Sequence, residues 1–248
     1  MHHHFNFRDV LASSARAAWQ IEDVLPEGAV LDFGRCFMPE SLARTADAPF
    51  LSNDERRLLN HIRGHEYLAL FGLVEEFILP FIIDHTRPQL GVAPSVEAET
   101  VATPYGDDHR VRALLQFASE EAKHIHLFRR FHDLFTQSFG TPCAMIGPAE
   151  AIAAEVLRHD PLAVALVILQ IEWMTQSHYL GSVKDDGDLD PLFKSLLRHH
   201  WIEEAQHAKL DTLMVETLAE GRDAAGIDAA IDEYLEIGTF LHGGVKAQ

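Results

Sequence analysis

Two Glu-x-x-His motifs on separate helical segments restrict the folds open to this 248-residue chain more than any other feature. The first is Glu121-Ala-Lys-His124, and the second is Glu204-Ala-Gln-His207. Residues three apart lie on adjacent turns of one helix face, so each motif presents a carboxylate and an imidazole together. One such motif arises by chance on many solvated helices. Two of them on long helices favour a fold in which both faces turn toward one interior site.

Helix signals dominate from residue 51 onward, without an alternating strand pattern or an internal repeat. Ser52 or Asn53 suits the N-cap of the first long helix, and Asp160 followed by Pro161 suits that of the third. Pro80 is expected to kink the first helix or to end its regular part. The predicted long helices span residues 53–84, 108–138, 160–181 and 189–219, and shorter helices span 7–24, 148–158 and 223–240.

The pattern predicts an all-α protein, a ferritin-like four-helix bundle with extra helices and an irregular amino-terminal arm. Residues 86–106, punctuated by proline and glycine, indicate a long crossing connection between the first two long helices. We expect one domain over residues 1–248. Residues 1–50 form the arm with its short helix, 51–220 the metal-binding core, and 221–248 the terminal helix.

Charge and cysteine content narrow the class of protein further. The formal net charge is −18, which disfavours binding to nucleic acid or to an anionic membrane surface. The apolar run at residues 162–171 is too short to span a bilayer and is followed by Glu172. Cys36 and Cys143 have no metal-binding spacing. Two free thiols are typical of a reducing compartment, so we expect a cytoplasmic protein.

Two further acids interrupt apolar helical runs. Glu172 lies within AVALVILQIEWM, where an unpaired buried carboxylate would cost several kcal/mol. In LALFGLVEEFILPF, either Glu75 or Glu76 plays the same part. The helical phase, with apolar positions such as Leu58 on one side and Asn60 pointing away, favours Glu76 and places Glu75 near the edge of the apolar sector.

Carboxylate-bridged dinuclear metal proteins have a characteristic ligand pattern. Two helices supply one Glu each, and the other two helices supply a Glu-x-x-His motif each. Four carboxylates balance the charge of two divalent cations. Oxygen and imidazole ligands suit iron, with manganese as the alternative. The expected metal ligands, including the additional His200 one turn before Glu204, are Glu76, Glu121, His124, Glu172, His200, Glu204 and His207.

An acid precedes each motif, Glu120 before Glu121 and Glu203 before Glu204. The arrangement resembles the methane monooxygenase hydroxylases and the small subunit of ribonucleotide reductase, which carry an Asp at that position. The resemblance implies that Glu120 and Glu203 hydrogen-bond ligand imidazoles and hold their orientation. A solvated charge is the alternative.

The segment His-x-x-x-Glu-x-x-His from His200 to His207 resembles a second family, the arylamine N-oxygenases of antibiotic biosynthesis. That family includes the p-aminobenzoate N-oxygenase and the related enzyme of the chloramphenicol pathway. The likeness covers roughly residues 50–220 and rests on the ligand order. It implies a diiron enzyme that activates O₂ and oxidises a small organic substrate, such as an amine nitrogen. Without a Rossmann glycine pattern or a CxxC, the electrons come from an external donor. We also expect a homodimer.

Three alternatives stay open at the level of the sequence. A ferritin-like ferroxidase or iron-storage protein needs the same ligands but no organic substrate. A dimanganese peroxide scavenger also fits the ligand set. A helical bundle without metal is the third alternative. His199 lies about 140° from Glu204 around the helix and is not expected to reach the site.

Overall fold

The computed structural model describes residues 5–90 and 108–248, and the side chains of residues 87–90 are not described. Within these ranges the chain is helical, with no strand and one isolated bridge between Cys36 and Leu189. The predicted all-α class is confirmed. In the described ranges no helix combines the length and apolar content needed to cross a membrane.

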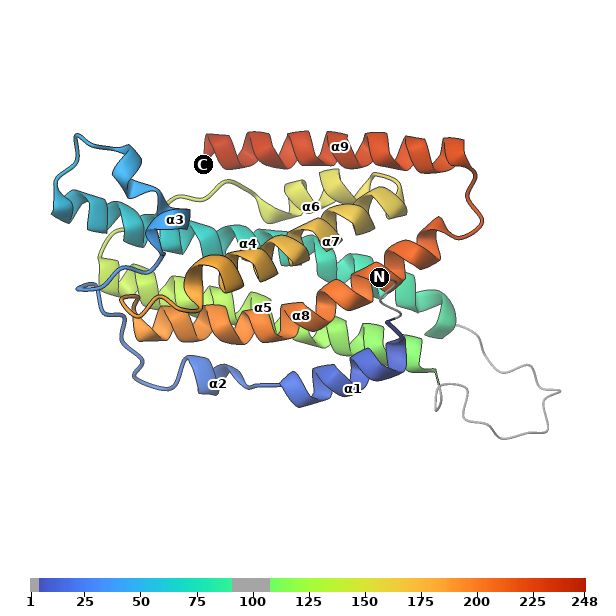
Figure 1. Ribbon diagram of the computed structural model, residues 1–248, viewed down its shortest axis with the longest axis horizontal. Coiled ribbons are helices and arrows are strands. Elements are labelled where there is room, and N and C mark those ends of the chain that lie inside the picture. Colours follow the sequence, from blue (N-terminus) through green and yellow to red (C-terminus); the bar gives the residue numbers. More distant parts are fainter. Residues whose placement is uncertain (1–4, 91–107) are drawn as a thin grey trace.

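Four long helices run side by side (Figure 1). They are α4 (Asn53–Leu90), α5 (His109–Phe139), α7 (Pro161–His178) and α8 (Pro191–Ala219). Their predicted starts are confirmed to within about two residues. The side chains of Asp108, Asp160 and Asp190 cap α5, α7 and α8 by accepting from backbone N–H groups of the first turn.

Helix ends differ more from the prediction. Helix α4 continues past Pro80, because a long helix packed along its length tolerates one missing N–H. Five residues of π-helix, Tyr179–Val183, follow α7. Helix α5 ends where predicted, at Gly140, whose φ of 76° is a left-handed conformation that glycine adopts without strain.

The four helices form two antiparallel pairs, α4 with α5 and α7 with α8, while α5 also contacts α8 (Figure 1). The chain returns along the bundle between α5 and α7, through α6 (Ala149–Leu157), which packs on α4. The expected crossing connection at 86–106 lies largely outside the described residues. Antiparallel neighbours such as α4 and α5 can be joined at one end of the bundle. In the described ranges, the segment that runs the length of the bundle is 140–160, between α5 and α7.

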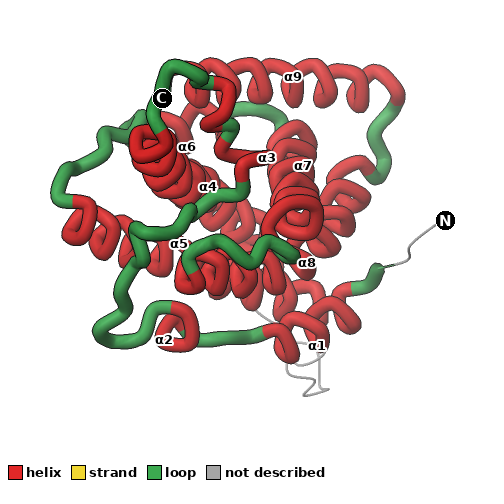
Figure 2. The backbone as a smooth tube through the Cα atoms, turned by 60° about the vertical axis from the view of Figure 1, so that its left-hand side comes forward, coloured by secondary structure: helices red, strands yellow, loops and turns green. Residues whose placement is uncertain are grey.

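Shorter helices cover two opposite sides of the bundle. The single helix predicted over residues 7–24 is two helices, α1 (Phe7–Ala17) and α2 (Ile21–Val24). Helix α1 lies across α5 and α8, whereas α9 (Ala224–Ala247) packs on α7 on the other side (Figures 1 and 2). Between α2 and α4 the arm is irregular, with only α3 (Glu40–Ala43) and η1 (Thr45–Asp47).

The apolar core consists of two clusters that occupy opposite ends of the long helices. One contains Phe131 of α5 and Phe193 of α8, and the other contains Phe117 of α5 and Met214 of α8. The Glu-x-x-His motifs fall between these clusters on both helices. A layer of polar side chains is therefore enclosed by packed apolar residues along the bundle, where water has little access.

Candidate metal centre

All four long helices contribute buried acids or histidines to the layer between the two apolar clusters. Glu121 and His124 of α5 are fully buried because their shared face points to the bundle axis. On α8 the spacing of four and three brings His200, Glu204 and His207 to the same axis, with at most 3 % of each residue exposed. Six of the seven sequence-predicted ligands are thus buried in one layer.

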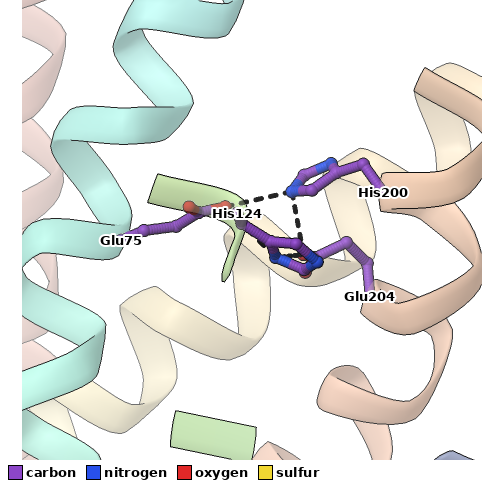
Figure 3. A group of neighbouring side chains, drawn as sticks. All are labelled: Glu75, His124, His200 and Glu204. Carbon is purple, nitrogen blue, oxygen red and sulfur yellow. Dashed lines mark hydrogen bonds and ion pairs between the residues drawn. The ribbon is translucent and has the colours of Figure 1, made fainter. Parts of the chain in front are cut away.

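These side chains form two overlapping groups whose potential ligand atoms lie within 4.8 Å of one another. One group, shown in Figure 3, contains Glu75, His124, His200 and Glu204. The other contains Glu121, His124, Glu204 and His207. His124 and Glu204 belong to both groups. Each group could therefore hold a cation.

The choice of Glu76 on α4 was wrong. Glu75 is 3 % exposed and its Oε1 lies 3.0 Å from His200 Nε2, whereas the Glu76 side chain is 33 % exposed and pairs with Arg129. The reference positions for the helical phase were misleading. Leu58 is 49 % exposed, and Asn60, expected to point outward, is buried and binds the backbone of the arm. Adjacent residues differ by only ~100°, so a small phase error exchanges them.

Glu172 of α7 is 2 % exposed and lies next to Glu204, although it belongs to neither group of four. Burial and the negative charge of Glu204 raise its pKa well above the ordinary value. The isolated acid in an apolar helix therefore faces the polar layer and does not reach water.

Some inward-facing atoms of the cluster have no hydrogen-bond partner, and the others contact only charged groups of the same cluster. Buried oxygens and nitrogens without a partner normally cost about 1–3 kcal/mol each, and they are rare in native proteins. Glu75 Oε2, Glu121 Oε2 and Glu172 Oε2 have no partner. The other inward atoms contact one another, with His207 Nδ1 2.8 Å from Glu121 Oε1 and His124 Nδ1 3.1 Å from Glu204 Oε1. Cations at the centre of the layer would satisfy all of them. The donor set thus fits a pair of metal ions.

The outer ring nitrogens of the two motif histidines, His124 and His207, are each bound by an acid from the opposite helix. Glu203 of α8 lies 2.8 Å from His124 Nε2, and Glu120 of α5 lies 3.0 Å from His207 Nε2. This crossed arrangement places a proton on each Nε2 and leaves each Nδ1 directed at the cluster. Glu120 and Glu203 are buried, so the alternative of solvated charges does not hold.

The cluster without metal holds protons. Burial alone would lower the pKa of His124 and His207, but the surrounding carboxylates raise both well above the ordinary value. Burial and the nearby Glu75 raise the pKa of Glu121 to about 7. Burial also opposes the charge on Glu204, yet His200 and His207 hold its pKa well below normal. Acids and imidazoles therefore share protons that cations would displace.

Metal uptake by the apo protein is expected to release protons and to weaken as the pH falls. Ligand groups must lose their protons to bind an ion. Because Glu121 titrates at about 7, the apparent Mn²⁺ affinity should fall more than about tenfold from about pH 7.5 to about pH 5.5. Isothermal titration in two buffers of different ionisation enthalpy measures the protons released. An affinity independent of pH would contradict binding at these groups.

Replacing each of the two neighbouring acids of α4 by glutamine in turn tests whether Glu75 or Glu76 is the ligand. Glu75→Gln should weaken the binding of divalent cations by roughly 10–100-fold, since it removes one charge from the cluster. Glu76→Gln is the matched control and should leave binding unchanged, because that side chain pairs with Arg129. Titration of apo protein with Mn²⁺ distinguishes the variants. Unchanged binding in Glu75→Gln would mean that Glu75 is not a ligand.

Sequence reasoning missed Asp211 and the contacts of the arm. Asp211 is 1 % exposed and its Oδ2 has no hydrogen-bond partner. Burial and the charges of Glu121 and Glu204 raise its pKa well above normal, and His207 opposes them. Its position four residues after His207 extends the polar stripe of α8 by one turn, and that spacing was a usable signal. The arm contacts had no such signal.

The fold and the site define an all-helical protein with a buried layer of acids and histidines suited to holding metal. No protein-family model matches the chain, and comparisons with curated proteins and with solved structures find no significant similarity.

Proposed function

We propose that the protein is a ferritin-like diiron enzyme that uses O₂ to oxidise a small organic substrate. The observation that carries the proposal is the buried set of carboxylates and imidazoles whose potential ligand atoms lie within 4.8 Å of one another, some of them without a hydrogen-bond partner. The residues that would hold the two ions are Glu75, Glu121, His124, Glu172, His200, Glu204 and His207. Iron is favoured over softer metals because the donors are carboxylates and imidazoles, and manganese is the alternative.

The connectivity of the helices supports a ferritin-like assignment. Two antiparallel pairs with one connection along the bundle, between α5 and α7, is the arrangement of that class. The ligands also follow its rule, with single acids from α4 and α7 and Glu-x-x-His from α5 and α8. Four carboxylates would neutralise two divalent ions, which offsets the cost of burying so many acids.

The protein's own part in the chemistry is to orient the ligands and exclude water. Glu203 holds His124, and Glu120 holds His207, with Nδ1 inward. The apolar clusters on both sides keep the layer at low dielectric, where these polar contacts are strong. When bound, the iron pair would supply the redox reaction with O₂.

His200 favours oxidation of an organic substrate. Its Nε2 lies 3.0 Å from Glu75 Oε1 and 2.8 Å from Glu204 Oε1, so it faces the cluster as a third imidazole. Together with the ligand order, this supports a reaction like that of the arylamine N-oxygenases, with oxygen transfer to an amine as the leading candidate. The two electrons that the reaction needs would come from a separate donor.

Metal content and O₂ reactivity test the proposal. Protein produced with iron available should contain two iron ions per chain by elemental analysis. After reduction, the addition of O₂ should change its optical spectrum, and an arylamine should be converted in a single turnover. A metal content of zero or one per chain would reject the dinuclear centre.

A ferroxidase is the second candidate, and one observation favours it. The two cavities described, of about 440 and 590 Å³, are lined by residues of the arm, the start of α4 and the ends of neighbouring helices, not by the cluster. A ferroxidase would consume many Fe²⁺ ions per chain and leave the arylamine unchanged. A dimanganese peroxide scavenger would instead release O₂ from H₂O₂.

A further inference from the structure

The arm contacts the outer carboxylate of Glu120 directly and reaches that of Glu203 through Lys123 of α5. Ser14 of α1 is 1 % exposed, and its hydroxyl donates to Glu120 Oε1 over 2.5 Å. Trp19, just beyond α1, accepts at its carbonyl oxygen from Lys123 Nζ over 3.1 Å. Lys123 Nζ also lies 2.5 Å from Glu203 Oε1. Two chains of contacts therefore run from the arm, through an acid, to the Nε2 of a ligand histidine.

The two chains differ in charge. Behind His124, the Glu203 carboxylate is paired with the Lys123 ammonium. Behind His207, the Glu120 carboxylate receives neutral donors, the Ser14 hydroxyl and the Gln116 amide at 2.8 Å. Apart from this difference the crossed acid–imidazole pairs are alike in geometry.

Trp19 holds Lys123 in place. The ammonium nitrogen lies 3.9 Å from the centroid of the indole ring, and the Lys123 side chain is only 17 % exposed. The same ring stacks on His124, with centroids 5.8 Å apart and planes at 12°. The ammonium is thus largely removed from water, and its effect on Glu203 is not screened as at a surface.

We propose that Lys123, held by Trp19, makes the two metal positions unequal. The position of Glu75 and His200, to which we assign His124, binds its ion more weakly than the position of Glu121 and His207. A carboxylate that accepts the Nε2 proton strengthens Nδ1 as an electron donor. A cation on that carboxylate withdraws part of this effect, whereas neutral donors withdraw less. The inference rests on the proposed dinuclear centre, and it makes Lys123 a positioning residue.

Cobalt titration of the full-length apo protein tests the inequality. The visible absorption of bound Co²⁺ and calorimetry should resolve two steps whose dissociation constants differ by roughly 10–100-fold. Lys123→Gln keeps the length of the side chain without its charge. This variant should bind the weaker Co²⁺ ion more tightly and reduce the ratio of the two dissociation constants by about tenfold. Lys123→Arg should restore the gap, which a purely structural defect would not predict.

Ser14→Ala is the matched control on the other chain of contacts. It removes only a neutral donor from Glu120, so the gap should stay the same or widen slightly. Melting curves of the apo variants show whether each one folds, and the two binding steps of the wild type test the inequality if Lys123→Gln does not fold. Two results would contradict the role of Lys123 but not the dinuclear centre. One is equal affinity for the two ions in the wild type, and the other is an unchanged difference between the two dissociation constants in Lys123→Gln. Failure to bind any Co²⁺ would overturn the dinuclear centre as well.

Discussion

Apo protein is expected to melt at least about 8 °C below protein loaded with two divalent ions. Without metal, the acids Glu75, Glu121, Glu172 and Glu204 share a buried layer, where like charges and burial oppose folding. An ion present at 1,000 times its dissociation constant stabilises the folded state by about 4 kcal/mol. For a chain of this size, each kcal/mol raises the melting temperature by about 2–4 °C.

Replacing one of these acids by glutamine should reduce the difference between the apo and loaded melting temperatures. Glu172→Gln removes the unfavourable burial of an ionisable group whose pKa is raised in the folded state, so the apo form should melt higher. It also removes one carboxylate ligand, so the loaded form should gain less from metal. Glu76→Gln, outside the cluster, is the control and should change neither temperature. Calorimetric scans of chelator-treated and Mn²⁺-loaded protein give both values. Equal melting temperatures for apo and loaded wild type would contradict a metal site in this layer.

Replacing His200 by alanine is expected to separate metal binding from reactivity. The variant loses one neutral donor and no charge, and the remaining acids and histidines still form a complete ferritin-type set. Metal affinity should fall by roughly 10–100-fold. The rate of the reaction of the reduced protein with O₂, or the conversion of substrate, should fall much further.

His199 is the matched control for this variant. Its Nδ1 lies 2.7 Å from the Ser195 carbonyl oxygen, and its ring meets the edge of Trp19, away from the cluster. His199→Ala should therefore react with O₂ like the wild type. Identical O₂ kinetics in the two variants would remove the argument from a third histidine and leave the ferroxidase as the better proposal.

The sequence by itself determined the helices and most of the buried layer, because both depend on local spacing. Asp160 and Asp190 cap their helices through bonds to residues two or three positions away, so their effect is readable without a fold. The Glu-x-x-His motifs place their side chains on one face by the geometry of a single helix. An acid in an apolar run, Glu172, signals burial for the same local reason.

Only the tertiary structure decided the relations between helices. Which side of α4 is buried depends on the segments that pack against it. The arm buries Asn60, and Glu75 faces the cluster where the sequence favoured Glu76. Which acid meets which imidazole follows from the facing of α5 and α8, since Glu120 and Glu203 each bind the histidine of the other helix. Lys123 and Trp19 are 104 positions apart. Their contact comes from the docking of the arm, and no helical period encodes it.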